Sequence, residues 1–153
     1  MVEITHAETG ETLLVVDAEE LAGANLSGVN VNGADLFDVD LTGACLRGTN
    51  LEGADLSSAT LVGADLGSAL LRGASLDYVN FRDALLDEAT DIDPKWRLVH
   101  DLATNGGSGR DLRKADLSKI RLNDVDLSGA DLSRANLGSS FLISVNLEEA
   151  NLE

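Results

Sequence analysis

The chain has 153 residues, a formal net charge of −16, one cysteine and only 3% aromatic residues. This length, with 44% hydrophobic residues, predicts a single domain spanning 1–153, and the lone Cys45 excludes an internal disulfide. The acidic N-terminus lacks the apolar run of a signal peptide and no stretch reaches membrane-spanning length, so we expect a cytoplasmic protein that does not contact a membrane.

Residues 1–20 differ from everything that follows. Two runs rich in apolar and β-branched residues, Glu3 to Ala7 and Glu11 to Val16, flank the turn residues Glu8-Thr9-Gly10. This pattern predicts a β-hairpin. Because a repeat array exposes apolar side chains and unpaired backbone at its first unit, we expect this hairpin to act as an N-terminal cap.

Residues 21–90 form a first repeat block, in which a large apolar residue recurs at every fifth position. Ala or Val usually stands two residues before it and Asp or Asn between them, while Gly often follows it by two. A period of five fits neither a helix nor a strand and indicates a repeat architecture. We expect the large and small apolar residues to fill a narrow closed lumen, Asp and Asn to point outward, and Gly to occupy corners with positive φ. The predicted structural core, taken across both repeat blocks, is Leu26, Leu36, Leu46, Leu56, Leu66, Leu76, Phe81, Leu117, Leu127 and Leu132.

The repeating unit resembles that of the pentapeptide-repeat family. The residues that carry the resemblance are Ala34-Asp35-Leu36, Ala54-Asp55-Leu56, Ala64-Asp65-Leu66 and Ala130-Asp131-Leu132. The resemblance implies an all-β solenoid, a right-handed quadrilateral β-helix with one pentapeptide per side and four per coil. The family that the chain resembles is especially numerous in cyanobacteria. The resemblance implies a rigid protein that interacts with other proteins and is not an enzyme.

Residues 91–109 interrupt the repeat. Asp93-Pro94 is a helix start signal and Asn105-Gly106 a stop signal, which together predict an inserted helix from Pro94 to about Thr104. Its apolar stripe consists of Trp96, Val99, Leu102 and Ala103. Leu70 and Leu85 occupy outward positions that elsewhere hold Asp or Asn, so we expect the stripe to pack on the outside of the first block near them. The Gly-rich run 106–109 lacks the ending of a phosphate-binding P-loop and is predicted to be a return loop.

Residues 110–153 form a second repeat block, shifted in phase by one residue. Its central positions are Leu112, Leu117, Leu122, Leu127, Leu132, Leu137, Leu142, Leu147 and Leu152. The sequence leaves open whether the two blocks form one continuous tube. Since an uncovered last coil is a liability, we expect a homodimer through the C-terminal coil.

No pattern of catalytic or metal-binding residues is present. His6 and His100 belong to different elements, and no Ser-His-Asp signature or zinc spacing occurs. We therefore expect no catalytic residues, no cofactor and no metal, and the net charge opposes direct binding of nucleic acid. The expected partner is an unknown protein. The candidate partner-binding residues are Trp96, Arg97, Arg110, Arg113 and Lys114, with Lys95, Lys119 and Arg121 in the same basic cluster and Phe37, Tyr78 and Phe141 as apolar outliers.

Charge is distributed unevenly along the chain, which bears on an alternative function. Residues 1–93 hold 18 acidic residues against three arginines, a net charge of −15, whereas residues 94–153 hold nine against eight basic residues, a net charge of −1. The resemblance extends to family members that protect DNA gyrase from quinolones, which suggests a mimic of duplex DNA acting on gyrase or another DNA-binding protein. The near-neutral second block and the scarcity of central Phe residues favour the interaction scaffold over the mimic.

Overall fold

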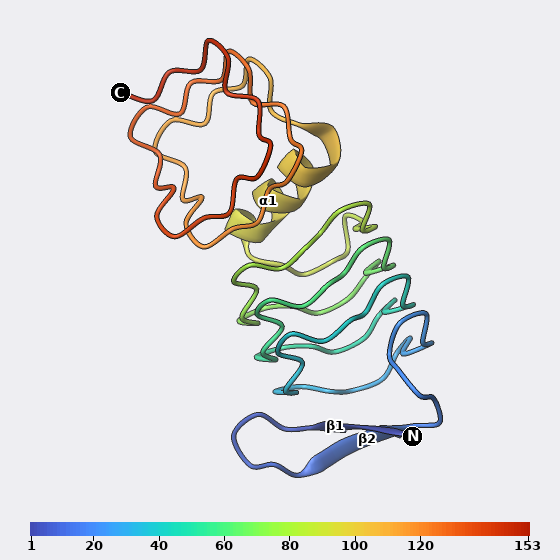
Figure 1. Cartoon of the computed structure of the whole chain (residues 1–153). Coiled ribbons are helices and arrows are strands. Elements are labelled where there is room, and N and C mark those ends of the chain that lie inside the picture. Colours follow the sequence, from blue (N-terminus) through green and yellow to red (C-terminus); the bar gives the residue numbers. More distant parts are fainter. The chain divides into compact units, whose positions relative to one another are not determined.

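A computed structural model describes all residues, 1–153, and the chain divides into two compact units, 1–93 and 94–153. The first unit contains strands β1 (Val2–Thr5) and β2 (Thr12–Val16) and the first repeat block. The second contains helix α1 (Pro94–Asn105) and the second repeat block. In Figure 1 the repeat blocks appear as stacked coils, and the coils of the second unit show their four sides.

Each pentapeptide is one side of a coil and ends in a β-turn. The backbone N–H of Ala59, for example, donates to the carbonyl of Leu56 at 2.9 Å, and the third residue of that turn, Ser58, has a φ of 64°. A positive φ at this position is the geometry of a type II turn, which glycine adopts most easily. Gly53 and Gly63, at the corresponding corners, have φ values of 66° and 64°, which confirms the predicted role of glycine.

Four such turns return the chain to the same side after 20 residues. Parallel bridges therefore join residues one coil apart, as between Asp35 and Asp55. The backbone N–H of Leu36 donates to the carbonyl of Asp55 at 2.8 Å, and the N–H of Asp55 donates to the carbonyl of Ala34 at 2.9 Å. Hydrogen bonds between coils thus hold together residues such as Ala, Asp and Asn, which are otherwise poor strand formers.

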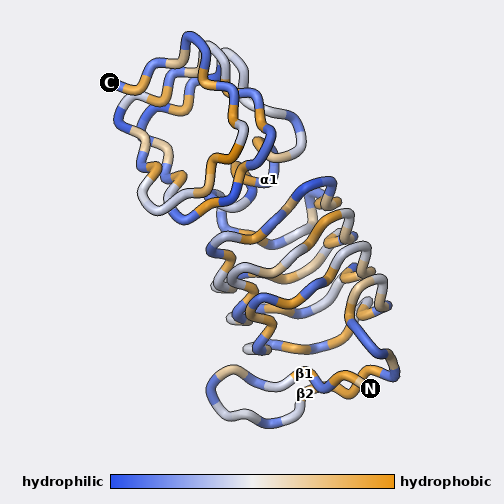
Figure 2. Tube along the Cα trace, in the orientation of Figure 1, coloured by the Kyte–Doolittle hydropathy of each residue, from blue (hydrophilic) through white to orange (hydrophobic).

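The lumen of each unit is filled by the central residues. Figure 2 shows apolar and polar segments alternating along the coils. All ten predicted core residues are buried, none more than 2% exposed. Thr49 occupies a small inward position, and its hydroxyl donates to the carbonyl of Leu26 at 2.6 Å, so this buried polar group is satisfied.

The Asp and Asn between the two apolar residues do more than face the solvent. Asp55 Oδ1 accepts the backbone N–H of Ser57 at 2.9 Å, and Asn50 Oδ1 accepts that of Glu52 at 3.0 Å. The side chain thereby satisfies the first free N–H of the following turn, as in an Asx turn. The turn uses only the side-chain oxygen, which explains why either Asp or Asn can occupy this position. In the second unit the amide nitrogens of Asn136, Asn146 and Asn151 also donate to the aspartate one coil earlier.

The strands β1 and β2 pair antiparallel and join the first coil. Val2 lies opposite Val16 and Ile4 opposite Leu14, with an irregularity between Ile4 and Thr5. The carbonyl of Thr5 accepts the N–H of Asp35 at 2.7 Å. Ile4 is only 2% exposed, so the hairpin places an apolar residue against the first coil within this unit.

Helix α1 belongs to the second unit and buries Trp96, Val99 and Leu102. A Cβ atom added to Gly107 would lie 2.8 Å from Leu102 Cδ2 and 2.7 Å from Leu127 Cδ2, so the helix residue contacts the lumen of the second block. The expected packing of the stripe near Leu70 and Leu85 stays a prediction; Leu85 is 60% exposed within the first unit. Within the second unit, Leu102 of the helix covers a position where the lumen of the second block would otherwise be open.

One extra residue in the last coil of the first unit explains the change of phase. Leu70 bridges to Asp91, 21 residues later, whereas the preceding bridges span 20. The extra residue lies in the segment 87–90, where the Thr90 hydroxyl donates to the carbonyl of Leu66 at 3.0 Å and Thr90 is only 3% exposed. This side of the coil therefore has six residues instead of five. Its inward polar residue, Thr90, can be buried there because the carbonyl of Leu66 accepts its hydroxyl.

The leucines of the last coil of the second unit are less buried than those of the coil before it. Leu117 and Leu127 are fully buried, but Leu137, Leu142 and Leu147 one coil later are only half-buried, and Leu152 is 57% exposed. The final coil therefore presents lumen side chains as an apolar surface. No helix of this protein has the length and apolar character needed to cross a membrane.

Candidate interaction surfaces

Arg110 and Arg113, two of the predicted partner-binding residues, are held by local carboxylates. Arg113 Nε and Nη2 donate to the two oxygens of Asp111 at 2.8 and 2.6 Å. These hydrogen bonds lower the pKa of Asp111 to about 2. Arg110 Nη1 lies 2.6 Å from Asp101 Oδ2 on helix α1. Both guanidinium groups are therefore partly neutralised, and each also joins neighbouring backbone segments.

Trp96 and its neighbours are integrated into the second unit. Trp96 is 7% exposed, and Lys95 Nζ lies 4.7 Å from the centroid of its ring. Lys95 also forms an ion pair of 3.2 Å with Asp116, whose pKa is lowered to about 2, mainly by the hydrogen bond from the Ser118 hydroxyl. Arg97 is half-buried. The indole therefore offers a partner little surface.

Lys114 is exposed and takes part in none of the ion pairs, unlike Arg110 and Arg113. It occupies a turn corner with a φ of 59°, and Arg134 occupies the same corner one coil later with a φ of 61°. Neighbouring coils lie about 4.8 Å apart. This corner therefore concentrates two exposed positive charges.

An apolar patch lies on the last coil of the second unit. Phe141 is 49% exposed and Ile143, two residues on, is 61% exposed. The guanidinium carbon of Arg121, in the preceding coil, lies 6.0 Å from the centroid of the Phe141 ring. Phe141 was expected from the sequence, whereas Ile143 was missed. The available signal was an isoleucine directly after a central leucine, where most other repeats have a polar residue or glycine.

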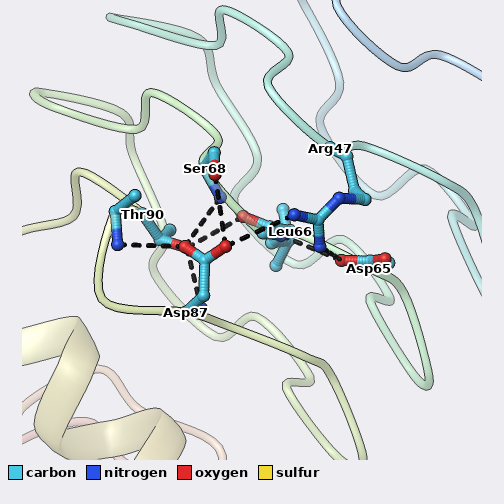
Figure 3. Close-up of polar contacts among 8 residues, drawn as sticks. Arg47, Asp65, Leu66, Ser68, Asp87 and Thr90 are labelled. Atoms are coloured by element: carbon cyan, nitrogen blue, oxygen red, sulfur yellow. Dashed lines mark hydrogen bonds and ion pairs between the residues drawn. The ribbon is translucent and has the colours of Figure 1, made fainter.

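The first unit carries two of the predicted apolar outliers and a network of charges. Phe37 is 57% exposed and Tyr78 is half-buried. Arg47 lies between Asp65 and Asp87, at 3.3 and 3.5 Å from their oxygens (Figure 3).

Asp87 is the centre of this network. It also accepts the backbone N–H of Ser68 at 2.9 Å, and this hydrogen bond is the main reason its pKa is lowered. A Cβ atom on Gly67 would lie 2.2 Å from Arg47 Nη1, so glycine leaves the room that this side chain occupies. The network links three successive coils and orders the six-residue side. No group of three or more His, Cys, Asp or Glu residues in the structure could hold a metal ion.

Comparison with known proteins identifies the repeat. The sequence model described as "Pentapeptide repeats (8 copies)" matches residues 20–53, 34–73, 49–87, 108–138 and 130–153. The chain belongs to the pentapeptide-repeat family. The resemblance drawn from the Ala-Asp-Leu units is thus confirmed, and proteins of this family fold as right-handed quadrilateral β-helices. No curated protein matches the chain.

Solved structures similar to this pentapeptide-repeat protein include cyanobacterial ones. HetL from Nostoc sp. strain PCC 7120, a pentapeptide repeat protein involved in heterocyst differentiation regulation, is 32% identical over 85% of this chain and 52% of HetL, with a TM-score of 0.45. The chain thus spans about half the length of HetL. Rfr23 from Cyanothece 51142 is 21% identical over 86% of this chain and 90% of Rfr23, with a TM-score of 0.30. A trypsin-treated form of QnrB1, a plasmid-mediated fluoroquinolone resistance protein, is 18% identical over 90% of this chain and 86% of QnrB1, with a TM-score of 0.34.

Proposed function

We propose that this pentapeptide-repeat protein is a non-catalytic scaffold that binds another protein through the outer surface of its second unit. The observation that carries the proposal is the exposed pair Phe141 and Ile143 beside Arg121, on coils whose interior is filled by leucines such as Leu117 and Leu127. Aromatic residues and arginine are enriched in protein interfaces, and a packed lumen offers no internal pocket for a substrate. The outer faces are then the surfaces on which binding takes place.

The basic corner of Lys114 and Arg134 extends this binding surface within the same unit. Lys114 is exposed and outside the ion pairs, while Arg110 and Arg113 shape the surface through their carboxylate partners. Exposed charges at an interface rim mainly raise the association rate and select the partner. We therefore infer that the partner presents an acidic rim around an apolar contact.

Affinity capture from the native host tests the proposal. The wild-type chain, the double variant Phe141→Ser/Ile143→Ser and the matched variant Phe37→Ser serve as baits, since Phe37 is equally exposed but lies in the first unit. We expect one identified protein to be retained by the wild type and by Phe37→Ser and lost with the double variant. Equal retention by all three baits would refute this binding surface.

We further infer that both β1–β2 and α1 act as caps and that the last coil is covered by a second copy of the chain. The support is the buried Ile4 in the hairpin, the contact of Leu102 with the lumen, and the incomplete burial of Leu137, Leu142 and Leu147. Stacking two such coils would remove these leucines from water. Sedimentation equilibrium of the wild type and of Leu142→Lys tests this: a dimer that Leu142→Lys converts to monomer is expected, and a wild-type monomer at high micromolar concentration contradicts it.

Mimicry of DNA is the second candidate function, favoured by the charge of the first unit. Its net charge is −15, and its three arginines, Arg47, Arg72 and Arg82, are all paired with aspartates. Unpaired carboxylates therefore dominate its surface field. A supercoiling assay with DNA gyrase tests this candidate: inhibition at micromolar protein supports it, and unchanged supercoiling removes it.

A further inference from the structure

A pocket in the first unit is lined by residues of β1, of the segment that enters the first coil and of that coil. Figure 1 shows the hairpin next to the first coil. The pocket has a volume of about 280 Å³, and its apolar lining includes Val2, Leu21, Leu36 and Val39. Small-molecule sites usually have volumes of about 300–1,000 Å³, and a cavity of about 150 Å³ already holds benzene. The pocket therefore has the size for one or two side chains rather than for a large cofactor.

Five carboxylates share the lining of this pocket with the apolar residues: Glu3, Glu19, Glu20, Asp35 and Asp40. Three of them make short-range hydrogen bonds with neighbouring N–H or hydroxyl groups, to Thr12, Phe37 and Thr42. None of these bonds neutralises the charge. Glu19 and Glu20 are exposed, at the point where the chain enters the first coil.

Neither an arginine nor a lysine lines the pocket of the first unit. The arginines of this unit form ion pairs elsewhere: Arg47 with Asp65 and Asp87, Arg72 with Asp91, and Arg82 with Asp83. Five like charges around an apolar depression repel one another, and a cation placed among them would relieve that repulsion. A ligand that also carries an aliphatic stem would cover the apolar lining. Anionic and purely apolar ligands lack one of these two contributions.

We propose that this pocket receives an arginine or lysine side chain from a basic segment of a partner protein. The aliphatic stem lies against Leu36 and Val39, and the charged group lies among the carboxylates of Glu19, Glu20 and Asp40. This surface belongs to the first unit and is separate from the patch around Phe141. This inference rests on the proposed scaffold function in one respect, namely that the side chain in the pocket belongs to a partner protein.

The test uses short peptides as probes, so that it does not depend on identifying the natural partner. An acetylated, amidated hexapeptide of alternating Arg and Leu is titrated into the isotopically labelled chain and followed by backbone amide NMR. The same peptide with citrulline in place of Arg is the neutral, nearly isosteric control. We expect the Arg peptide to shift the amides of residues 2–5 and 36–40, with weaker binding at high salt. The citrulline peptide should bind about tenfold more weakly.

A pair of variants of equal charge separates the pocket from general attraction to an acidic protein. Glu19→Gln/Glu20→Gln removes two charges from the pocket, and Glu8→Gln/Glu11→Gln removes two exposed charges from the hairpin turn, outside the pocket lining. The first variant should weaken binding of the Arg peptide by about three- to tenfold, and the second should weaken it much less. Equal effects of the two variants, equal binding of the citrulline peptide, or amide shifts confined to other residues would overturn the proposal.

The same variants decide between a partner protein and a second copy of this chain. Self-association of the wild type at low salt, lost in Glu19→Gln/Glu20→Gln and kept in Glu8→Gln/Glu11→Gln, would assign the pocket to a second copy and overturn the assignment to a different partner. Binding of the Arg peptide does not depend on Phe141 and Ile143. If the peptide binds the pocket but affinity capture retains no protein that depends on Phe141 and Ile143, the proposed function alone is refuted. Capture without peptide binding would refute the pocket alone.

Discussion

Leu102 of helix α1 lies over Gly107 in the second unit, where a Cβ atom would be 2.8 Å from its Cδ2. Position 107 precedes Leu127 by one coil and so corresponds to a central position of the repeat. Glycine leaves this position empty, and the helix fills the space with a side chain that is fully buried. The helix therefore replaces a missing leucine of the ladder.

Replacing Gly107 with alanine should destabilise the second unit by about 1–3 kcal/mol, because the added methyl overlaps Leu102 and Leu127. In a Leu102→Ala background the same change should cost less than half as much, since the space is then free. Urea denaturation followed by fluorescence of Trp96, the only tryptophan, reports on this unit. Ser133→Ala, on a solvent-facing turn, is the control and should change stability little. Equal costs in both backgrounds would show that Leu102 does not occupy this space.

Truncating a leucine in the middle of a coil stack should be far more damaging than truncating one in the less buried last coil. Leu56→Ala should destabilise the first unit by about 2–5 kcal/mol, because a closed tube cannot collapse around the cavity. Leu142→Ala should cost less than half of that in the second unit, since Leu142 is only half-buried. Urea denaturation followed by circular dichroism measures the loss of stability in Leu56→Ala. Urea denaturation followed by Trp96 fluorescence measures the loss in Leu142→Ala. Similar losses would mean that the last coil is covered in solution.

The turn-capping role of the repeat carboxylates predicts different effects of two substitutions at one site. Asp55→Asn keeps the oxygen that accepts the N–H of Ser57 and should be nearly neutral. Asp55→Ala removes that acceptor and should cost about 0.5–1.5 kcal/mol. Thermal denaturation of the two variants and the wild type provides the comparison. If the asparagine variant lost as much stability as the alanine variant, charge rather than the turn hydrogen bond would be the cause.

Acidification should weaken the second unit between about pH 4 and pH 2. In the folded state Asp111 and Asp116 have pKa values lowered to about 2 from the ordinary 3.8. A lowered pKa means that folding favours the ionised carboxylate, so this stabilisation is present above the unfolded pKa and is lost as the pH falls through the folded one. Carboxyl carbon NMR between pH 1.5 and 6 measures both values.

Arg113→Gln is the matched variant for this titration. It should raise the pKa of Asp111 toward its ordinary value, because the side chain of Arg113 is the main cause of the shift. It should leave Asp116 unchanged, since the pKa of Asp116 depends on Ser118 and Lys95. A wild-type Asp111 that titrates near 3.8 would contradict the observed ion pair.

The periodic part of the fold could be predicted from the sequence because each repeat has the same environment. A leucine every five residues with a small residue at a fixed offset has few ways to be buried, so Leu36, Leu56 and Leu76 had to face a common lumen. The hydrogen bonds that Asp55 and its equivalents accept were not predicted. Asp and Asn are suited both to facing the solvent and to accepting a neighbouring N–H, so the sequence pattern does not distinguish the two roles. The exposure of Ile143 was missed for a similar reason, as any apolar residue near a central leucine can be read as core.

The sequence alone thus determined the family, the coil and the residues of the ladder, because these follow from short-range repetition in which every unit satisfies its neighbours one coil away. Only the tertiary structure decided where the irregular segments go. The stripe of α1 suited any apolar surface, and within the second unit Gly107 left a vacant lumen position that Leu102 fills. The pocket beside β1 likewise depends on how a non-repeating hairpin meets the first coil, since its apolar lining and its carboxylates come from segments far apart in the chain. Such contacts depend on shape and on distant partners, which a local pattern does not encode.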